Sequence, residues 1–363
     1  MSGPHEHNQR SGVAVTIRHV AERAAVSIAS VSRVLNGTGS VAPRTRARVL
    51  RAVKALNYVP HESARSLITR RTHTIGVLLP DMHGEFFSEL IRDFDQEARS
   101  RGLYLLVTSS HGNEAEVGRA LRAMNGRVDG VLIMSPFAHA SLVDASLAAQ
   151  LPVVMLNAPE SVTAKPVIAV DNFGGACAMV RHLQGQGCRR IVHISGQSTN
   201  FDASERLRGF RAAMRGEAHT GGDGTEVQRP SPRISDRELA ELVLAGDFSE
   251  ESGYRAGQQL AQQNKRPDAV FAANDTMAVG CLLAFQEARL RVPDDVALAG
   301  FDDVPFTRYT SPPLTTVRAR LDQLSRSAFE MLDAGALAQP INRLIVPAEL
   351  TVRRSSQWRA DER

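Results

Sequence analysis

Short, uninterrupted apolar runs recur along this chain from His73 onward, separated by longer amphipathic stretches. The first runs are TIGVLLP (74–80), LYLLVTS (103–109), VDGVLIM (128–134) and LPVVMLN (151–157), and later ones are PVIAVDN, RRIVHIS, DAVFAAND and DVALAGFDD. Runs of this length without polar alternation are typical of strands covered on both faces. The intervening stretches, roughly 15–25 residues long, are sufficient for crossover helices. The pattern predicts a doubly wound, parallel α/β body.

The length of the chain predicts more than one domain. A single hydrophobic core rarely grows beyond about 250–300 residues, and this chain has 363. Its 43% apolar and 23% charged residues are ordinary for globular proteins. Some eight to ten strands suit two similar subdomains with a cleft between them better than one wide sheet.

Membrane, disulfide and metal chemistry lack support in the sequence. No apolar run approaches the roughly 20 residues that cross a bilayer, and MSGPHEHNQRSG at the start has no signal-peptide core. We therefore expect a cytoplasmic protein without a membrane partner. Cys177, Cys188 and Cys281 are odd in number and have no C-x-x-C spacing, which predicts three reduced, buried thiols. No metal site and no cofactor are expected.

Common catalytic motifs are also missing. The sequence contains no G-x-G-x-x-G after a strand, no phosphate-binding G-x-x-x-x-G-K-[ST], no H-E-x-x-H and no G-x-S-x-G. An enzyme with catalytic residues assembled from distant positions stays an alternative, but the prediction is that the protein is not an enzyme.

Positive charge is concentrated at the start of the chain. Residues 1–72 contain 12 lysines and arginines and 3 acids, a net charge of +9, whereas the remainder has a net charge of −5. A small basic unit joined to an acidic body is typical of a nucleic-acid-binding module attached to a domain with another task.

Two helix-start signals lie within this basic region. Thr16 and Ser27 are each suited to cap a helix. A hydrophobic staple flanks each cap, formed by Val15 with Val20 and by Val26 with Val31. Two short helices joined by a turn around 24–26 form a helix-turn-helix.

The second of these helices is predicted to read DNA. Its buried face carries Val31, Val34 and Leu35, and its exposed side carries Ile28, Ala29, Ser30 and Arg33. A third helix over about 43–57 is expected to bury Val49, Leu50, Val53 and Leu56, and it carries Arg44, Arg46, Arg48, Arg51 and Lys54, some of which should meet phosphates. The alternative is a small helical bundle whose charges form only a solvated face.

Residues 15–67, VTIRHVAERAAVSIASVSRVLNGTGSVAPRTRARVLRAVKALNYVPHESARSL, resemble the DNA-binding head of the lac repressor (LacI/GalR) family. The resemblance continues at GDFSEESGYRA (246–256), PDAVFAANDTMAVG (267–280), RVPDDVALAGFDDV (291–304) and SPPLTTVR (311–318), so it covers nearly everything after the first fourteen residues.

The resemblance implies a set of DNA-binding residues. They are Thr16, Ser27, Ile28, Ala29, Ser30, Arg33, Asn36 and Leu67. Ile28 and Ala29 offer no hydrogen bonds and would contact thymine methyls, whereas Arg33 would pair with guanine O6 and N7. Two residues depart from the family pattern, namely Ala25, where glycine is frequent, and Ala42, which replaces the usual polar cap of the third helix.

A hinge is expected at 61–72, which is too short to bury a core of its own. The resemblance matches ARSL (64–67) to a hinge helix that forms on the operator and pushes a leucine, here Leu67, into the minor groove. The alternative is a passive linker with Leu67 packed on the body.

Polar residues that end the apolar runs are candidates for ligand binding, because ligands of open α/β sheets bind beyond the carboxyl ends of the strands. They are Asp81, Ser135, Asn157, Asp171, Asn274 with Asp275, and Asp302. Arg206 adds a cation, and Phe86, Phe87 and Phe248 add aromatic faces. The alternatives are helix caps or surface ion pairs for the carboxylates and core positions for the phenylalanines.

The resemblance makes Arg206, Asn274 and Asp302 effector contacts, and makes Phe248 and the pair Phe86–Phe87 pocket walls. Asn157 completes the predicted effector set. An arginine and a carboxylate together hold adjacent hydroxyls, as in the sugar-binding members. Asn157-Ala158 stands where purine-binding relatives have an aromatic residue, which disfavours a nucleobase as the effector. Sugar acids and phosphosugars remain alternative effectors.

Together these features predict an α/β protein with an N-terminal three-helix helix-turn-helix domain and two doubly wound parallel-sheet subdomains of the periplasmic-binding-protein type. The predicted parts are a flexible tail (1–15), the DNA-binding domain (16–60), the hinge (61–72), an N-terminal effector subdomain (73–170 and 320–346) and a C-terminal effector subdomain (171–319 and 347–363).

The predicted function is that of a homodimeric transcriptional regulator, a repressor, which binds near-palindromic operator DNA under the control of a sugar-like effector. The alternatives are a sugar-binding protein serving transport, which requires export, and a carbohydrate-acting enzyme that uses the same cleft.

Overall fold

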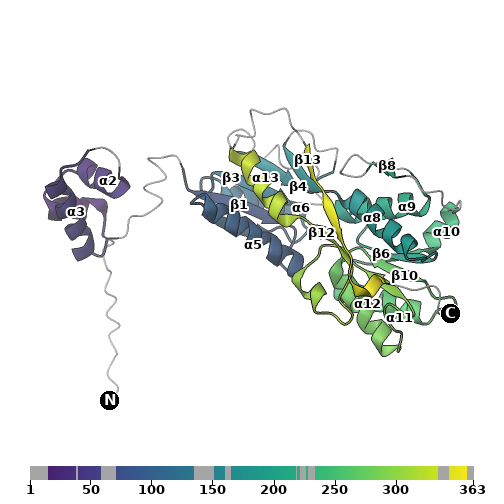
Figure 1. Cartoon of the computed structure of the whole chain (residues 1–363). Helices are drawn as coiled ribbons and strands as arrows, with labels where there is room; N and C mark the ends of the chain where they lie inside the picture. Colours follow the sequence, from purple (N-terminus) through teal and green to yellow (C-terminus); the bar gives the residue numbers. More distant parts are fainter. Residues whose placement is uncertain are drawn as a thin grey trace, which may run out of the picture. The chain divides into compact units, whose positions relative to one another are not determined.

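The computed structural model divides the chain between Thr72 and His73 into two units, which we call the head and the body (Figure 1). The structure describes residues 15–37, 40–58, 71–134, 151–159, 165–217, 219–220, 226–227, 234–333 and 343–357. Residues 1–14 of the predicted tail, most of the hinge with Leu67, and Ser135 lie outside these ranges.

Three helices form the head: α1 (Ile17–Ala24), α2 (Ile28–Asn36) and α3 (Pro43–Ala55). Each helix contributes one fully buried valine to a common core, namely Val20, Val31 and Val49. Val15 and Val26, the outer members of the two predicted staples, pack against this core. The hydrophobic spacing of the sequence therefore folds into a three-helix unit with a core of its own.

The third helix differs in part from the prediction. It ends at Ala55, because Leu56 is its C-cap residue and Asn57 takes a left-handed conformation with φ of 46°. Leu50 is not buried as predicted, since half of its surface is exposed. Ala52 and Tyr58 occupy the core instead. Helical spacing allows either residue 50 or residue 52 beside residue 49, and packing against the other two helices selects the smaller side chain.

A six-stranded, fully parallel sheet forms one part of the body, in the order β13-β5-β4-β3-β1-β2. Its strands are β1 (Thr74–Leu79), β2 (Tyr104–Ser109), β3 (Gly130–Met134), β4 (Val153–Leu156), β5 (Val167–Val170) and β13 (Arg343–Val346). The register aligns Val77 of β1 with Val107 of β2 and Leu132 of β3.

Helices cover both faces of this sheet. Helices α5 (Glu85–Ser100) and α13 (Leu321–Asp333) lie side by side on one face (Figure 1), and α6 (Glu114–Met124) packs on the other. Successive residues of β1 point to opposite faces of the sheet. Val77 and Leu79 therefore pack in the core beneath α5 and α13, and Leu78 packs in the core beneath α6. Coverage on both faces explains why the strands are continuously apolar.

A four-stranded parallel sheet, ordered β11-β10-β6-β9, forms the second part of the body. Its strands are β6 (Ile191–Ser195), β9 (Val243–Ala245), β10 (Ala269–Ala272) and β11 (Ala297–Ala299). Helices α8 (Asn172–Gly185) and α9 (Phe201–Met214) pack together, as do α11 (Glu250–Ala261) and α12 (Asp275–Glu287), and the two pairs flank the sheet (Figure 1). Two doubly wound parallel sheets confirm the predicted fold class.

A two-stranded antiparallel ladder of β12 (Thr316–Ala319) and β14 (Ala348–Thr351) carries the chain between the two sheets. Strand β12 leads from the four-stranded sheet to α13, and β14 leads back from β13 to the short helix η2 (Arg354–Ser356), which contacts β11. Asp303 fixes this junction through ion pairs with Arg318 and Arg353 at 2.7 and 2.5 Å.

The remaining described elements are peripheral. They are the short ladder of β7 (His219–Thr220) and β8 (Glu226–Val227), helix α10 (Asp236–Glu241) and the 3-10 turn η1 (Pro305–Arg308). Strands β7 and β8 pair antiparallel. All three cysteines are free and buried, as predicted. In the ranges given above, no helix has both the length and the apolar character needed to cross a bilayer.

Candidate functional site

The start of α2 is fixed by its cap. The Ser27 hydroxyl accepts the Ser30 amide at 3.2 Å and lies 3.0 Å from the Ser30 hydroxyl. Thr16 occupies the corresponding position before α1, where its own N–H donates to His19 Nδ1 at 3.2 Å. Both cap residues therefore lie where the sequence predicts them.

One face of α2 is free of the head core. Ile28 is 45% exposed, and Ala29 and Arg33 are also exposed. Ser30 is half-buried, and Asn36 donates from its side-chain amide to Ser32 Oγ at 3.1 Å. The structure thus brings an isoleucine, an alanine and an arginine together on an open helix surface.

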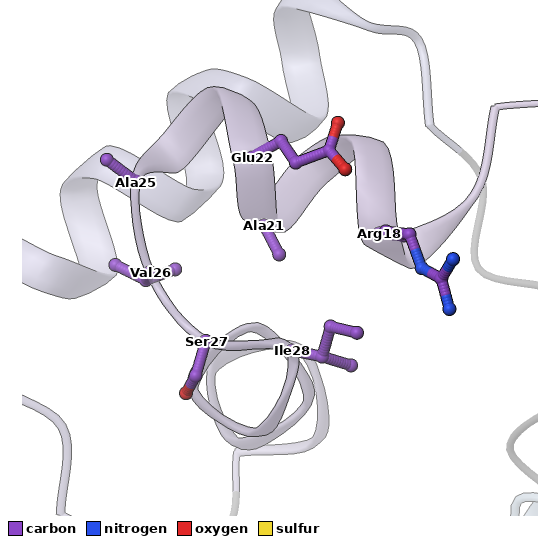
Figure 2. A pocket seen from close by; sticks show the side chains of 7 residues that line it. All are labelled: Arg18, Ala21, Glu22, Ala25, Val26, Ser27 and Ile28. Carbon is purple, nitrogen blue, oxygen red and sulfur yellow. The ribbon is translucent and has the colours of Figure 1, made fainter.

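A shallow hollow between α1 and α2 borders this face. Figure 2 shows its lining residues, which are Arg18, Ala21, Glu22, Ala25, Val26, Ser27 and Ile28. Its apolar floor comes from alanine and valine, and its rim carries the charged side chains of Arg18 and Glu22. The exposed side chain of Ile28 lies at the edge of this hollow (Figure 2).

The turn between α1 and α2 is held by a residue whose role the sequence did not indicate. Ala25 takes a left-handed conformation with φ of 49°, which disfavours residues with a side chain. Arg48 of α3 donates from Nη2 to the Ala24 carbonyl and, at 2.7 Å, to the Ala25 carbonyl. Arg48 therefore caps the end of α1.

Substitution of Arg48 by alanine is expected to destabilise the head by about 1–2 kcal/mol, because two charge-assisted hydrogen bonds to carbonyls are lost. Hydrogen exchange of the α1 and α2 amides in the full chain measures this opening free energy. Arg46→Ala, which removes an exposed arginine of the same helix, is the control and should change it by less than about 0.5 kcal/mol. Equal effects of the two substitutions would contradict the capping role.

In the body, Arg206 of α9 is the centre of a buried polar network. Its Nε donates to Asn172 Oδ1 at 2.7 Å and its Nη1 donates to the Ala273 carbonyl at 2.5 Å. Its Nη2 lies 3.0 Å from Asp302 Oδ1 in an ion pair. The guanidinium stacks on the Phe301 ring, 3.8 Å from the centroid, and lies 6.0 Å from the Phe248 centroid.

Asp202 joins this network to the six-stranded sheet. Its carboxylate accepts Asn172 Nδ2 at 2.8 Å and Asn157 Nδ2 at 3.2 Å. Asn157, which follows β4, accepts the Val170 amide at 3.0 Å. Asp202 is absent from the predicted site residues, although its position four residues before Arg206 places both on one face of a helix. That spacing is the signal that would have found it.

Asn274 is engaged by the protein on both sides of its amide. Its Nδ2 donates to the Phe248 carbonyl at 3.0 Å, and its Oδ1 accepts the Met277 amide at 2.9 Å as the N-cap of α12. The neighbouring Asp275 is buried and accepts Thr316 Oγ1 at 2.6 Å and the Val304 amide at 3.0 Å.

Three predicted effector residues have positive φ angles, a conformation that non-glycine residues rarely take. The angles are 47° at Asn157, 72° at Phe248 and 111° at Asp302. Gly196 makes the Phe248 position possible, since a Cβ at residue 196 would clash with the Phe248 ring. Such conformations cost roughly 1–3 kcal/mol each and cluster at functional sites, where surrounding contacts hold them.

Burial controls the protonation of this network. It raises the pKa of Asp202 to about 6, and it also raises the pKa of Asp302 and of Asp275, while the Arg206 guanidinium lowers the pKa of Asp202 and Asp302. Asp302 is only 8% exposed, and its Oδ1 pairs with Arg206 Nη2 at 3.0 Å. A carboxylate has about four acceptor positions on its two oxygens, so this ion pair leaves room for a further donor.

The other predicted ligand residues have partners of their own. Phe86 and Phe87 sit in the first turn of α5, pack against the core of the six-stranded sheet and meet edge to face with centroids 5.4 Å apart. Asp81 accepts the backbone amides of its own loop, and Asp171 caps α8 through the Gly174 amide. These two carboxylates fit the structural alternative.

No group of histidine, cysteine and carboxylate side chains suited to a metal ion occurs among the residues described. The groups that converge at Arg206 are hydrogen-bond donors and acceptors on a rigid scaffold. This arrangement is suited to binding a small polar molecule.

Comparison with known proteins matches the head and the body each to a protein-family model. Residues 16–61 match the model described as bacterial regulatory proteins, lacI family, and residues 180–356 match that of the periplasmic binding protein-like domain. The HTH-type transcriptional repressor PurR of Klebsiella pneumoniae (strain 342) is 38% identical over 321 residues, covering 87% of this chain and 89% of that protein.

Two solved structures extend the similarity to three dimensions. The lac repressor dimer bound to operator and the anti-inducer ONPF is 26% identical, with a TM-score of 0.81, and covers 94% of this chain and 99% of that one. The complex of the transcriptional regulator CelR with cellobiose is 29% identical, with a TM-score of 0.65 and the same coverage.

A helix-turn-helix head joined to a periplasmic-binding-protein-like body defines a DNA-binding transcriptional regulator with a ligand-binding domain. The similarity extends over most of the chain and includes both units. The chain belongs to the LacI family of bacterial regulatory proteins. This membership confirms the predicted family and the prediction that the protein is a repressor rather than an enzyme.

Proposed function

We propose that the protein is a homodimeric repressor that reads its operator with the exposed face of α2. The observation that carries this proposal is the division of α2, in which Val31 and Val34 are buried while Ile28 and Arg33 project outward. In the major groove Ile28 and Ala29 would contact thymine methyls, and Arg33 would pair with guanine O6 and N7.

The remaining predicted residues have supporting roles in this proposal. Thr16 and Ser27 begin helices whose N-termini attract phosphate groups. Ser30 and Asn36 lie on α2 within reach of the DNA backbone or base edges. Leu67 is proposed as the minor-groove wedge from the family resemblance alone, since it lies outside the described residues.

Titration of the full-length protein against a library of near-palindromic duplexes tests this function. We expect one sequence to bind at least about 10³-fold more tightly than the rest, with the logarithm of the affinity falling linearly with the logarithm of salt concentration. Binding that is equal for all sequences, or independent of salt, would contradict the proposal. A scrambled duplex of the same composition is the control.

We further propose that the effector is sugar-like and binds at the Arg206 network. Asp302 offers a buried carboxylate with acceptor positions beyond its ion pair with Arg206, and Phe248 offers an aromatic face near Arg206. Asn274 supports the site by holding Phe248 in place. Phe86 and Phe87 are proposed as walls on the side of the six-stranded sheet. The similarity to CelR, which was solved with cellobiose, supports this effector class.

The backbone of Asp302 would couple ligand binding to DNA binding. Its amide donates to the Val317 carbonyl at 2.7 Å, and its carbonyl accepts the Ala319 amide at 3.4 Å. Both partners belong to β12, which connects the two sheets. A ligand that moves Asp302 would therefore shift β12 and change the orientation of subdomains 73–170 with 320–346 and 171–319 with 347–363. Coupling of this kind is typically 1–3 kcal/mol.

The dimer follows from the symmetry that a near-palindromic operator requires. The similar lac repressor structure is an operator-bound dimer. Two heads of one dimer would bind the two half-sites, and the effector would set their spacing through the hinge.

A further inference from the structure

The guanidinium of Arg206 is already engaged by the protein. Each of its three nitrogens faces a protein oxygen, on Asn172, Ala273 and Asp302. One of its faces is covered by Phe301 at 3.8 Å. An arginine that binds an anionic ligand offers a free edge with two parallel N–H donors. Three of the five N–H donors of Arg206 are thereby used, so an anionic ligand would have to share the guanidinium with Asp302 and the Ala273 carbonyl.

The charges around Arg206 do not balance. Asp202 and Asp302 are 7% and 8% exposed, and Arg206 is the single buried cation that the described residues place between them. Asp275 adds a third buried carboxyl group, whereas Asp303 is neutralised by its own pair of arginines. An additional negative charge in this poorly solvated place would meet carboxylates at short range, where repulsion is strong.

The hydrogen-bonding positions that the network leaves unused are acceptors, which a ligand can satisfy only with a donor group. Asp302 Oδ1 is buried, and Arg206 Nη2 at 3.0 Å is the donor that the described residues place beside it, so the carboxylate keeps acceptor positions for a further donor. The side-chain amides of Asn157 and Asn172, which would otherwise be donors for a ligand, are directed to Asp202. A hydroxyl or an ammonium group satisfies a carboxylate oxygen, and an anion does not.

We propose that the effector site selects uncharged, hydroxyl-rich or cationic molecules over anionic ones with the same skeleton, and that Asp202 sets this selection. Asp202 does so by sharing the charge of Arg206 and by occupying the amide donors of Asn157 and Asn172. The raised pKa of Asp202 has the same origin, since burial penalises negative charge there. This inference rests on the proposed effector site and narrows its ligand class.

The test uses the full-length protein and a thermal-shift library of matched molecules, followed by calorimetry. Each series shares one skeleton: glucose, glucosamine, gluconate and glucose 6-phosphate; galactose, galactosamine and galacturonate; ribose and ribose 5-phosphate; adenosine and its monophosphate. In every series that binds, we expect the anionic member to be at least tenfold weaker than the neutral or cationic member. An anion that binds equally or more tightly overturns the selection and leaves the effector site standing. A library without any hit overturns both.

Asp202→Asn tests the residue itself. The variant removes the charge and returns amide donors to the site, so the affinity ratio of neutral to anionic ligand should fall at least tenfold. Asp236→Asn removes the same charge from a side chain that is 88% exposed and should leave the ratio unchanged. An equal loss of affinity for all ligands, with the ratio preserved, would show that Asp202 has only a structural role.

The wild-type protein provides a second measurement that needs no variant. Asp202, with its pKa of about 6, and Asp302 take up protons as the pH falls. As the pH falls from 8 to 5, the ratio of the affinity for a neutral sugar to that for its sugar acid, whose carboxylate stays ionised, should therefore decrease. A constant ratio over this range would contradict the role of these carboxylates.

Discussion

Replacement of Arg206 by methionine is expected to destabilise the body by about 3–5 kcal/mol. Arg206 is 4% exposed, and its removal leaves the buried carboxylates of Asp202 and Asp302 without a compensating charge. The Ala273 carbonyl and the Asn172 amide oxygen also lose their donors. Urea denaturation followed by circular dichroism measures the loss.

Arg211→Met is the matched control, because it removes an exposed arginine from the same helix. It should change the free energy of unfolding by less than about 0.5 kcal/mol. Similar values for the two variants would show that the Arg206 network contributes nothing beyond a surface charge.

The cost of Arg206→Met should also grow with pH. Both carboxylates have folded-state pKa values above their unfolded values, so each stabilises the folded protein below its unfolded pKa and loses this contribution as the pH rises through about 6. Removing Arg206 raises these pKa values further, because its charge lowers them in the wild type.

The difference between variant and wild type should therefore be larger at pH 8 than at pH 5. His193, whose pKa burial lowers to about 3, destabilises both proteins as the pH falls and largely cancels in the difference. A pH-independent difference would contradict the charge argument.

Replacement of Arg33 by alanine is expected to weaken specific operator binding roughly five- to 150-fold. This range corresponds to the 1–3 kcal/mol of one bidentate arginine–guanine pair. Arg33 is exposed on α2 and lies outside the head core, so the fold of the head should be retained. Fluorescence anisotropy with specific and scrambled duplexes measures both affinities, and binding to the scrambled duplex should change far less.

Arg44→Ala is the comparison, since it removes an exposed arginine near the start of α3. A phosphate contact of this kind should weaken binding to all duplexes alike and reduce the salt slope by about 1. If Arg33→Ala behaves in the same way, Arg33 contacts phosphate and α2 reads the operator through other residues.

Most of the fold was predictable because the buried strands of the α/β body are recognisable in the sequence. Eight of its strands appear as continuous apolar runs, since helices cover both sheet faces. Strands β9 and β13 were missed because their apolar residues are few and partly exposed. Leu50 was misassigned because helical spacing alone does not distinguish neighbouring positions at the edge of a buried face.

The candidate site was predictable only in part. Asn157 and Asp302, which follow parallel strands, join the same network as Arg206 of α9. Phe86 and Phe87 pack against the core of the six-stranded sheet instead. The roles of Asp202 and Arg48 were not predicted, because the partners that define them lie far away in the sequence. Asp202 meets Asn157 across 45 residues, and Arg48 meets Ala24 across 24.

The sequence by itself determined the order of the domains, the two apolar faces of each sheet and the exposed side of α2, because these depend on periodicity and local capping. Only the tertiary structure decided which buried carboxylates and polar groups interact with the charge of Arg206. Distance and burial set the strength of electrostatic interactions, and both are properties of the folded chain. The grouping of Asp202, Arg206 and Asp302 in one desolvated cluster is therefore a result of folding.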